Sequence, residues 1–377
     1  MASARTFRRT GTAAAVVLAI VCVPAGLRGA QQQAQTGAPA PAKAADPAMQ
    51  AQVEQMQSLV RLTDSAMMGQ PAPSDFPIQF QNDFIRAQGS RVWVPMTLTI
   101  DSSKLSNPAG EPMTVYLRVA PRGMTAPPPP PPASKDTKDS KDKKKKDAKN
   151  PEPPPPSPYA FEDFAQIEPH PSAPGQPIRI MRGVGVPAGN YDLYIALQER
   201  GPTPPKTAVL KQPLDVPNYA SEFSTSSVIV ASETRQLPSA VTPEQQADHP
   251  YSFGTNEIVV SPDHVFKKTQ ELLILLQVYN PTITADKKFS LQVAYTFFKQ
   301  GPAGESRFNA TAPQDLTPET LGPAFDPSAA DRSIQAGQGV PLQSFPEGKY
   351  RLEITITDKD ASPAKTLTQS VNFTVTP

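Results

Sequence analysis

The sequence predicts an all-β protein built from two tandem immunoglobulin-like β-sandwich domains behind a disordered N-terminal tail. Three observations favour this fold class. Several short segments alternate apolar and polar side chains, one strand element occurs twice, and neither copy contains a convincing long helix. We expect a signal peptide over 1–30, a linker over 31–74, and domains over 75–217 and 218–377.

The clearest strand runs from Arg91 to Asp101, where every second side chain is apolar. This period of two is typical of a strand with one buried face. Pro95 removes one backbone N–H from the ladder, so we expect an edge or a bulge at that position. Met113 to Val119 is a candidate partner strand. The apolar series comprises Val92, Val94, Met96, Leu98 and Ile100.

The same plan recurs later in the chain. Aligning Pro187 with Pro346 without gaps matches the late strands of the two copies, and aligning Val92 with Leu272 matches the early strands. The two alignments differ in offset, so the first copy contains extra chain between its early and late strands. The late matches pair Pro187, Gly189, Tyr191, Leu193, Ile195, Pro204, Lys206, Thr207 and Val216 with Pro346, Gly348, Tyr350, Leu352, Ile354, Pro363, Lys365, Thr366 and Val375.

The repeated Pro-x-Gly-x-Tyr-x-Leu-x-Ile element predicts a structural role for its tyrosine. It resembles the tyrosine corner of immunoglobulin-like and fibronectin-like domains, in which the phenol bonds to backbone upstream. We therefore interpret Tyr191 and Tyr350 as structural rather than ligand-binding residues. In the second copy, Ser221 to Ala231 predicts a first strand and Leu272 to Tyr279 a central one, while Gly301 to Gly339 predicts loops with irregular strands.

A proline- and lysine-rich insertion accounts for the extra chain of the first domain. Proline runs at 127–132 and 151–158 flank a charged stretch, so we expect residues 122–158 to be disordered. The basic run Lys143, Lys144, Lys145 and Lys146 is a candidate electrostatic site for an anionic surface polymer, lipid head groups or an acidic partner. A solubilising spacer is the favoured alternative, and missing aromatic residues argue against nucleic acid.

The N-terminus predicts export from a bacterial cell, to the periplasm or beyond. Arg5, Arg8 and Arg9 precede an apolar run from Ala13 to Val23, which matches a signal peptide and leaves no transmembrane segment after cleavage. An uncleaved N-terminal anchor is the alternative. Cys22 is the only cysteine, and a lipid anchor there is disfavoured because Val21 is large for the position before it.

A short amphipathic helix is predicted inside the linker. Met49, Val53, Met56 and Val60 recur at helical spacing, which favours a helix from about Pro47 to Met67. The simpler interpretation is a marginal helix that packs against nothing in particular, because isolated helices of this length are barely stable in water. The alternative is a docking or self-association helix.

The second domain also resembles a known group of sequences. Ser-Ser-Val-Ile-Val-Ala at 226–231, Tyr-Ser-Phe-Gly at 251–254, the strand at 271–280 and Gly-Lys-Tyr-Arg-Leu at 348–352 are similar to the C-terminal β-sandwich regions of acidobacterial GWxTD-type secreted proteins. The Gly-Trp-x-Thr-Asp element itself is absent, and the only tryptophan is Trp93. The resemblance implies an envelope or secreted protein of unsettled role.

No catalytic, cofactor or metal site is predicted. His170, His249 and His264 lack metal-ligand spacing, and the glycine signatures of nucleotide sites and hydrolase nucleophiles are absent. Lys+Arg 36 against Asp+Glu 35 gives no global field that would select a charged partner. The leading hypothesis is a non-enzymatic scaffold that binds another envelope protein. A glycan or surface-polymer module is the alternative, and an unrecognised hydrolase is a third class.

Overall fold

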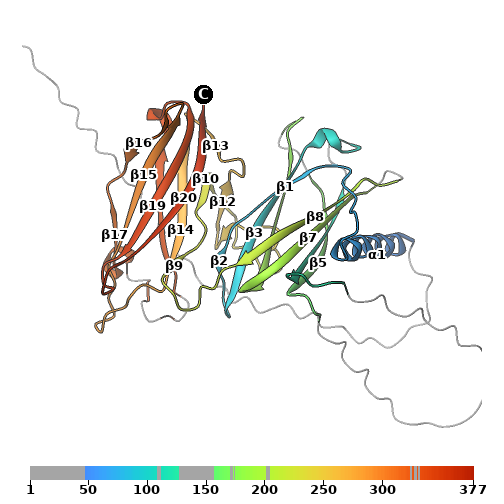
Figure 1. The fold of residues 1–377 in the computed structure, drawn as a ribbon, viewed down its shortest axis with the longest axis horizontal. Helices are drawn as coiled ribbons and strands as arrows, with labels where there is room; N and C mark the ends of the chain where they lie inside the picture. Colours follow the sequence, from blue (N-terminus) through green and yellow to red (C-terminus); the bar gives the residue numbers. More distant parts are fainter. Residues whose placement is uncertain are drawn as a thin grey trace, which may run out of the picture.

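The computed structural model describes residues 47–107, 112–126, 157–169, 173, 175–200, 204–322, 325–326, 329 and 332–377. These residues form mainly strands, arranged as two β-sandwiches, which confirms the predicted all-β class (Figure 1). The expected signal peptide, residues 31–46 of the expected linker, and Lys143 to Lys146 lie outside the described residues. Within the described part of the chain, no helix is long and apolar enough to cross a membrane.

Domain 1 consists of two four-stranded sheets and one long helix. In one sheet β3 pairs with β1, β2 and β6, and the order of the other is β5-β4-β7-β8. The inner faces enclose a single apolar core that includes Met96, Leu98, Val115 and Ile195. The elements are α1 (Pro47–Met67), β1 (Ile78–Asn82), β2 (Ile85–Arg86), β3 (Arg91–Ile100), β4 (Met113–Pro121), β5 (Phe161–Ile167), β6 (Ile178–Pro187), β7 (Gly189–Glu199) and β8 (Thr207–Val216).

Domain 2 has the same two layers with six-stranded sheets. One sheet has the order β11-β12-β10-β14-β18 with β9 on β14, and the other has the order β13-β20-β19-β15-β16 with β17 on β15. The elements are β9 (Ser224–Thr225), β10 (Ile229–Gln236), β11 (Ser252–Phe253), β12 (Asn256–Val260), β13 (Val265–Lys267), β14 (Glu271–Tyr279), β15 (Leu291–Gly301), β16 (Gly304–Ala310), β17 (Gln314–Leu316), α2 (Pro318–Leu321), β18 (Ile334–Pro341), β19 (Gly348–Asp358) and β20 (Lys365–Thr376).

The strands of the two domains follow the internal repeat. β7 and β8 occupy in domain 1 the places that β19 and β20 occupy in domain 2, and β3 corresponds to β14. The Tyr191 hydroxyl donates to the Pro187 carbonyl at 3.2 Å, and the Tyr350 hydroxyl donates to the Pro346 carbonyl. Gly189 has a φ of +153°, and a Cβ there would lie 3.1 Å from the Tyr191 hydroxyl. Gly189 therefore leaves room for the Tyr191 ring that closes the corner, whereas the side chain beside the equivalent Gly348 is that of Lys299.

The helix of the linker runs from Pro47 to Met67 as predicted, but the simpler interpretation, that it packs against nothing, is wrong. It lies on the outer face of the β4–β7–β8 layer, on the side of domain 1 away from domain 2 (Figure 1). Leu59, Thr63 and Met67 are buried there. This cover explains why β4 and β7 are buried on both faces instead of alternating, since their outer side chains lie beneath the helix.

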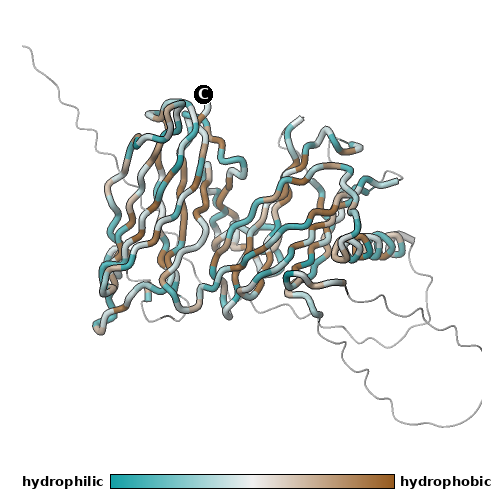
Figure 2. The backbone as a smooth tube through the Cα atoms, viewed as in Figure 1, coloured by the Kyte–Doolittle hydropathy of each residue, from teal (hydrophilic) through white to brown (hydrophobic). Residues whose placement is uncertain are grey.

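Two further expectations need correction. The stretch 301–339 contains β18, a regular strand of eight residues that pairs with β14 along its length, because the hydrophobic residues of β18 alternate with glycine and glutamine. Part of the stretch 122–158, which we expected to be disordered, has a described conformation. Residues 122–126 and 157–158 are described, and the Gly123 N–H donates to the Asp192 carboxylate at 3.2 Å. Residues 127–156 lie outside the described residues. Figure 2 shows the hydrophobic residues following the strands of both domains.

Candidate functional site

Two sites concentrate polar groups, and the first lies where the insertion leaves domain 1. Arg118 of β4 points away from the sandwich core, on the same face of the sheet as Tyr116, and its side chain is only 3% exposed. A buried guanidinium is costly unless charged partners surround it. In this protein α1 and β5 supply those partners.

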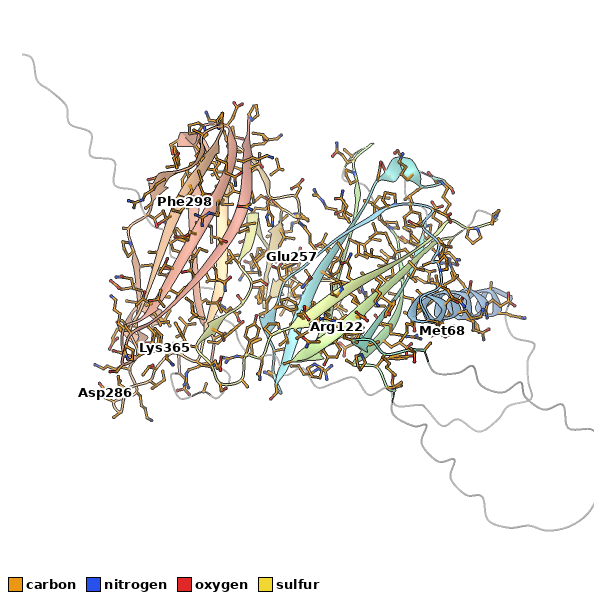
Figure 3. All side chains as sticks on the ribbon, in the orientation of Figure 1. Met68, Arg122, Glu257, Asp286, Phe298 and Lys365 are labelled. Carbon is orange, nitrogen blue, oxygen red and sulfur yellow. The ribbon has the colours of Figure 1, made fainter. Side chains whose placement is uncertain are left out.

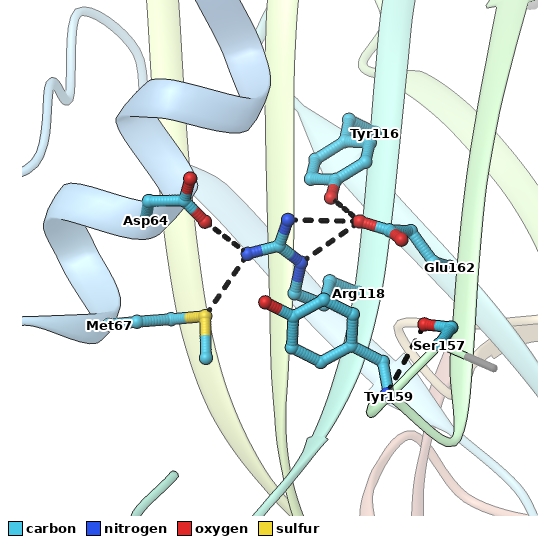
Figure 4. A network of polar contacts seen from close by, with 7 residues as sticks. All are labelled: Asp64, Met67, Tyr116, Arg118, Ser157, Tyr159 and Glu162. Atoms are coloured by element: carbon cyan, nitrogen blue, oxygen red, sulfur yellow. Dashed lines mark hydrogen bonds and ion pairs between the residues drawn. The ribbon is translucent and has the colours of Figure 1, made fainter. Parts of the chain in front are cut away.

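The contacts of Arg118 join three segments of the chain (Figure 4). Its Nη1 binds the Asp64 carboxylate of α1 and contacts the Met67 sulfur at 3.2 Å. Its Nε and Nη2 donate to Glu162 Oε1 of β5 at 3.1 and 2.9 Å. The Tyr116 hydroxyl also donates to Glu162. The guanidinium carbon lies 4.2 Å from the centre of the Tyr159 ring. We call these residues the Arg118 network.

The electrostatics of the Arg118 network suit an anchor rather than an acid–base catalyst. Burial and the hydrogen bond to Glu162 raise the pKa of Tyr116, so its phenol stays protonated. Burial lowers the pKa of Arg118, but the bonds to Asp64 and Glu162 outweigh it and hold the pKa above its usual value. Each of the three guanidinium nitrogens donates to a carboxylate through these bonds.

The Arg118 network fixes both ends of the insertion against α1. Met67 packs with Tyr194 in a small cluster that also includes Met124 and Ala126 before the insertion and Tyr159 after it. Arg122, labelled in Figure 3, binds the Asp215 carboxylate at 2.7 Å. The lysine-rich segment is therefore tethered at two ordered points on the helix-covered face.

The second site is the junction between the domains. Trp93 of β3 lies across Gly183 of β6, where a Cβ would come within 2.1 Å of the indole ring. Its Nε1–H donates to the Pro250 carbonyl of domain 2 at 2.9 Å, and the Gly183 N–H donates to the Ala247 carbonyl at 2.8 Å. Only glycine at 183 permits this approach of the two domains.

Apolar side chains and charges surround the tryptophan. Ile85 is buried together with Ile229, Tyr251 and Ile258 of domain 2, and a cavity of about 30 Å³ opens beside them. Arg182 pairs with Asp163 of its own domain and with Asp248 of domain 2. The Arg86 guanidinium lies 4.5 Å from the centre of the Tyr279 ring, and the Arg86 N–H donates to the Tyr279 hydroxyl at 2.9 Å.

Asp83 is the buried carboxylate of the junction. It accepts a hydrogen bond from the Tyr251 hydroxyl at 2.8 Å. Burial raises the pKa of Asp83, and the bonds from Tyr251 and Ser227 offset part of this effect. Burial and the neighbouring Asp83 charge also raise the pKa of Tyr251 well above its usual value. The Asp83–Tyr251 pair therefore makes the stability of the contact between the domains depend on pH.

The two described histidines, His249 and His264, do not form a common site. His249 binds Glu257, labelled near the junction in Figure 3, at 2.8 Å, and the His264 ring contacts the Asn372 carbonyl at 2.9 Å. His170 lies outside the described residues. Across the residues that the structure describes, no group of three or more histidine, cysteine, aspartate or glutamate side chains is arranged to hold a metal ion. Tyr191 and Tyr350 lie at the two corners, where their hydroxyls donate to backbone carbonyls.

The sequence reasoning missed the Arg118 network and the junction, although one signal for the junction was present. Gly-x-Gly-Val-Pro occurs at 183–187 and again at 337–341, at equivalent places in β6 and β18. Two glycines spaced by two on one face of a strand mark a close approach of other groups. No such signal exists for Arg118, since a single arginine in an apolar strand does not indicate which distant carboxylates it binds.

Comparisons with known proteins add little to this description. No protein-family model and no curated protein matches the chain. Among solved structures, Escherichia coli α2-macroglobulin activated by porcine elastase matches with 13% identity and a TM-score of 0.21, over 80% of this chain and 22% of that one. The trypsin-activated form matches with 11% identity and a TM-score of 0.20, over 81% and 17%. The chain thus spans about a fifth of those proteins.

The substitution Arg118→Ala tests the Arg118 network. It leaves two carboxylates without their cation, so we expect the free energy of unfolding to fall by about 3 kcal/mol, the lower end of the range for buried pairs because both acids are partly exposed. Trypsin should cleave faster after Arg61 on the loosened helix. Arg351→Ala, which removes an arginine held by Glu305 and Glu353 in domain 2, is the control. Equal cleavage at Arg61 in both variants would contradict the anchor.

The substitution Asp83→Asn tests the buried carboxylate. Because its folded pKa is raised, the folded protein holds this proton more tightly, and the stability that Asp83 contributes falls as pH rises from about 3.8 through the folded value. We expect urea unfolding of the wild type to show this loss with pH and the variant to lack it. Asp360→Asn is a control at a partly exposed aspartate. Identical pH profiles for wild type and Asp83→Asn would refute the assignment.

Proposed function

We propose that this chain is a non-enzymatic, exported envelope protein whose tandem sandwiches bind or scaffold another protein. The observation that supports it most is the junction, where Trp93 on Gly183 and the Asp83–Tyr251 bond join the domains face to face. A platform of fixed shape presents loops, edges and an attached segment in constant relative positions. Such preorganisation lowers the entropy cost of binding.

The insertion supports the same proposal. Its ends are fixed by the Arg118 network, and its sequence carries Lys143 to Lys146 between proline runs. A tethered basic segment raises the local concentration of an acidic partner near the platform. The basic N-terminal run with its apolar stretch supports export to the periplasm or beyond.

An anionic surface polymer is the second candidate partner, and the lysine run favours it. Four consecutive lysines bind a polyanion through nonspecific electrostatics, without a shaped pocket. Such binding weakens steeply as salt screens the charges. Salt dependence therefore separates this partner from a protein bound on the sandwich surfaces.

Crosslinking in envelope fractions tests the proposal. Full-length protein is compared with a variant in which Ala126 is joined to Ser157, and with a full-length variant in which Lys143 to Lys146 are glutamine. If the insertion is the contact, we expect the shortened protein to lose its crosslinked partner and the glutamine variant to retain less than half. If the partner persists in both variants, the sandwich surfaces carry the function. If none of the three proteins recovers a crosslinked protein partner, the proposal is refuted.

A further inference from the structure

The two edge strands that carry Gly-x-Gly-Val-Pro are equivalent but have different neighbours. β6 pairs with β3 in domain 1 as β18 pairs with β14 in domain 2. Gly183 lies opposite Pro95, and Gly337 lies opposite Leu275 in the corresponding place. In domain 1 this edge is occupied, because the Gly183 N–H donates to Ala247 of the other domain.

The corresponding part of β18, Gly337 to Gly339, is open within the described part of the chain. β18 ends the order of its sheet, and no described group beyond β14 bonds to the backbone of Gly337 or Gly339. Because Gly183 directs its N–H outward, the equivalent Gly337 does so too, and Gly339 follows at the period of two. The strand has no lysine and no proline before Pro341, the residues that usually protect an edge.

The outer face beside this edge has a defined chemistry. Gly337 contributes no side chain, so the Leu275 side chain lies 3.2 Å from where a Cβ would stand. The cavity of the junction opens next to it, lined by Ile229, Leu275 and Ala336 among others. The Glu271 side chain extends across Gly339, with its carboxylate oxygen 2.2 Å from the place of a Cβ, and it is exposed to solvent.

We infer that the β18 edge binds an extended segment of a partner protein, which adds a strand beside β18 with an aliphatic side chain over Gly337 and a basic side chain against Glu271. A residue opposite Gly337 places its side chain on the same face, where it reaches Leu275 and the mouth of the cavity. The residue opposite Gly339 lies two positions away and meets the Glu271 carboxylate. Strand addition of this kind takes affinity from the backbone and specificity from alternate side chains.

A second copy of this chain fits the edge poorly. Antiparallel pairing of two β18 strands would put glycine near glycine, leave the apolar recess unfilled, and bring two Glu271 carboxylates to one surface. Like charges across a strand pair are destabilising. The charge and shape of the edge therefore select a different chain, with a basic and an aliphatic residue spaced by two.

This inference deepens the proposed protein-binding function and rests on it, and its test uses synthetic probes of known sequence. The full chain is titrated into fluorescent nine-residue peptides that consist of threonine except for one valine and one lysine two positions apart. Two matched peptides replace the lysine by glutamate, or carry N-methyl groups on alternate backbone amides. We expect the lysine peptide to bind, the glutamate peptide to bind about fivefold more weakly, and the N-methylated peptide not to bind.

The variant Glu271→Lys should reverse the preference between the lysine and glutamate peptides, while Glu347→Lys, at another exposed glutamate of domain 2, should leave it unchanged. Equal binding of all three peptides, an unchanged preference in Glu271→Lys, or no binding would overturn the inference. A concentration-dependent dimer that the peptide dissociates would make a second copy the occupant and overturn it as well. If wild-type protein still crosslinks to an envelope protein in those cases, the proposed function stands without this site.

Discussion

The contact of Trp93 with Gly183 is the constraint on which the arrangement of the two domains depends. An indole can lie on a strand only where the strand offers no side chain, and its N–H must find an acceptor when it is covered. The Pro250 carbonyl of domain 2 is that acceptor. The same approach brings Ile85 against the apolar outer face of domain 2 and buries Asp83 beside Tyr251. One glycine thus lets two sandwiches share a surface.

The other end of domain 1 is governed by a similar requirement. The outer face of β4 and β7 carries Tyr116, Ala120, Tyr194 and Ala196. Exposing these apolar surfaces to water would cost free energy of folding. Helix α1 covers them, and Arg118 fixes the helix by pairing with Asp64. Since the insertion starts and ends at the same place, the residues that stabilise the helix also fix the base of the insertion. The stability of the helix on the sheet and the position of the base of the insertion therefore depend on the same residues.

The sequence was sufficient for the fold class and for the repeat, because a period of two and the recurring tyrosine element are local signals. It was sufficient for the bounds of α1. It did not identify the face of the helix that packs, since Val53 and Met56 of the predicted series are exposed and Leu59, Thr63 and Met67 are buried instead. It was insufficient for the partners of Arg118 and Trp93, since these lie in segments far apart along the chain. The stretch 301–339 was predicted as loops with irregular strands, and it holds the regular strand β18, whose two glycines weaken the local strand pattern. Their packing role is visible only beside β14.

The most direct test of the account is the distance between the domains in solution. With Cys22 replaced by serine, cysteines at Asp215 in domain 1 and Lys288 in domain 2 carry spin labels, and pulsed electron resonance measures their separation. The account predicts one narrow distance distribution for the wild-type junction and a broad one after Gly183→Val, which displaces Trp93. A broad distribution with Gly183 intact, or an equally narrow one in the variant, would contradict a junction held by this contact.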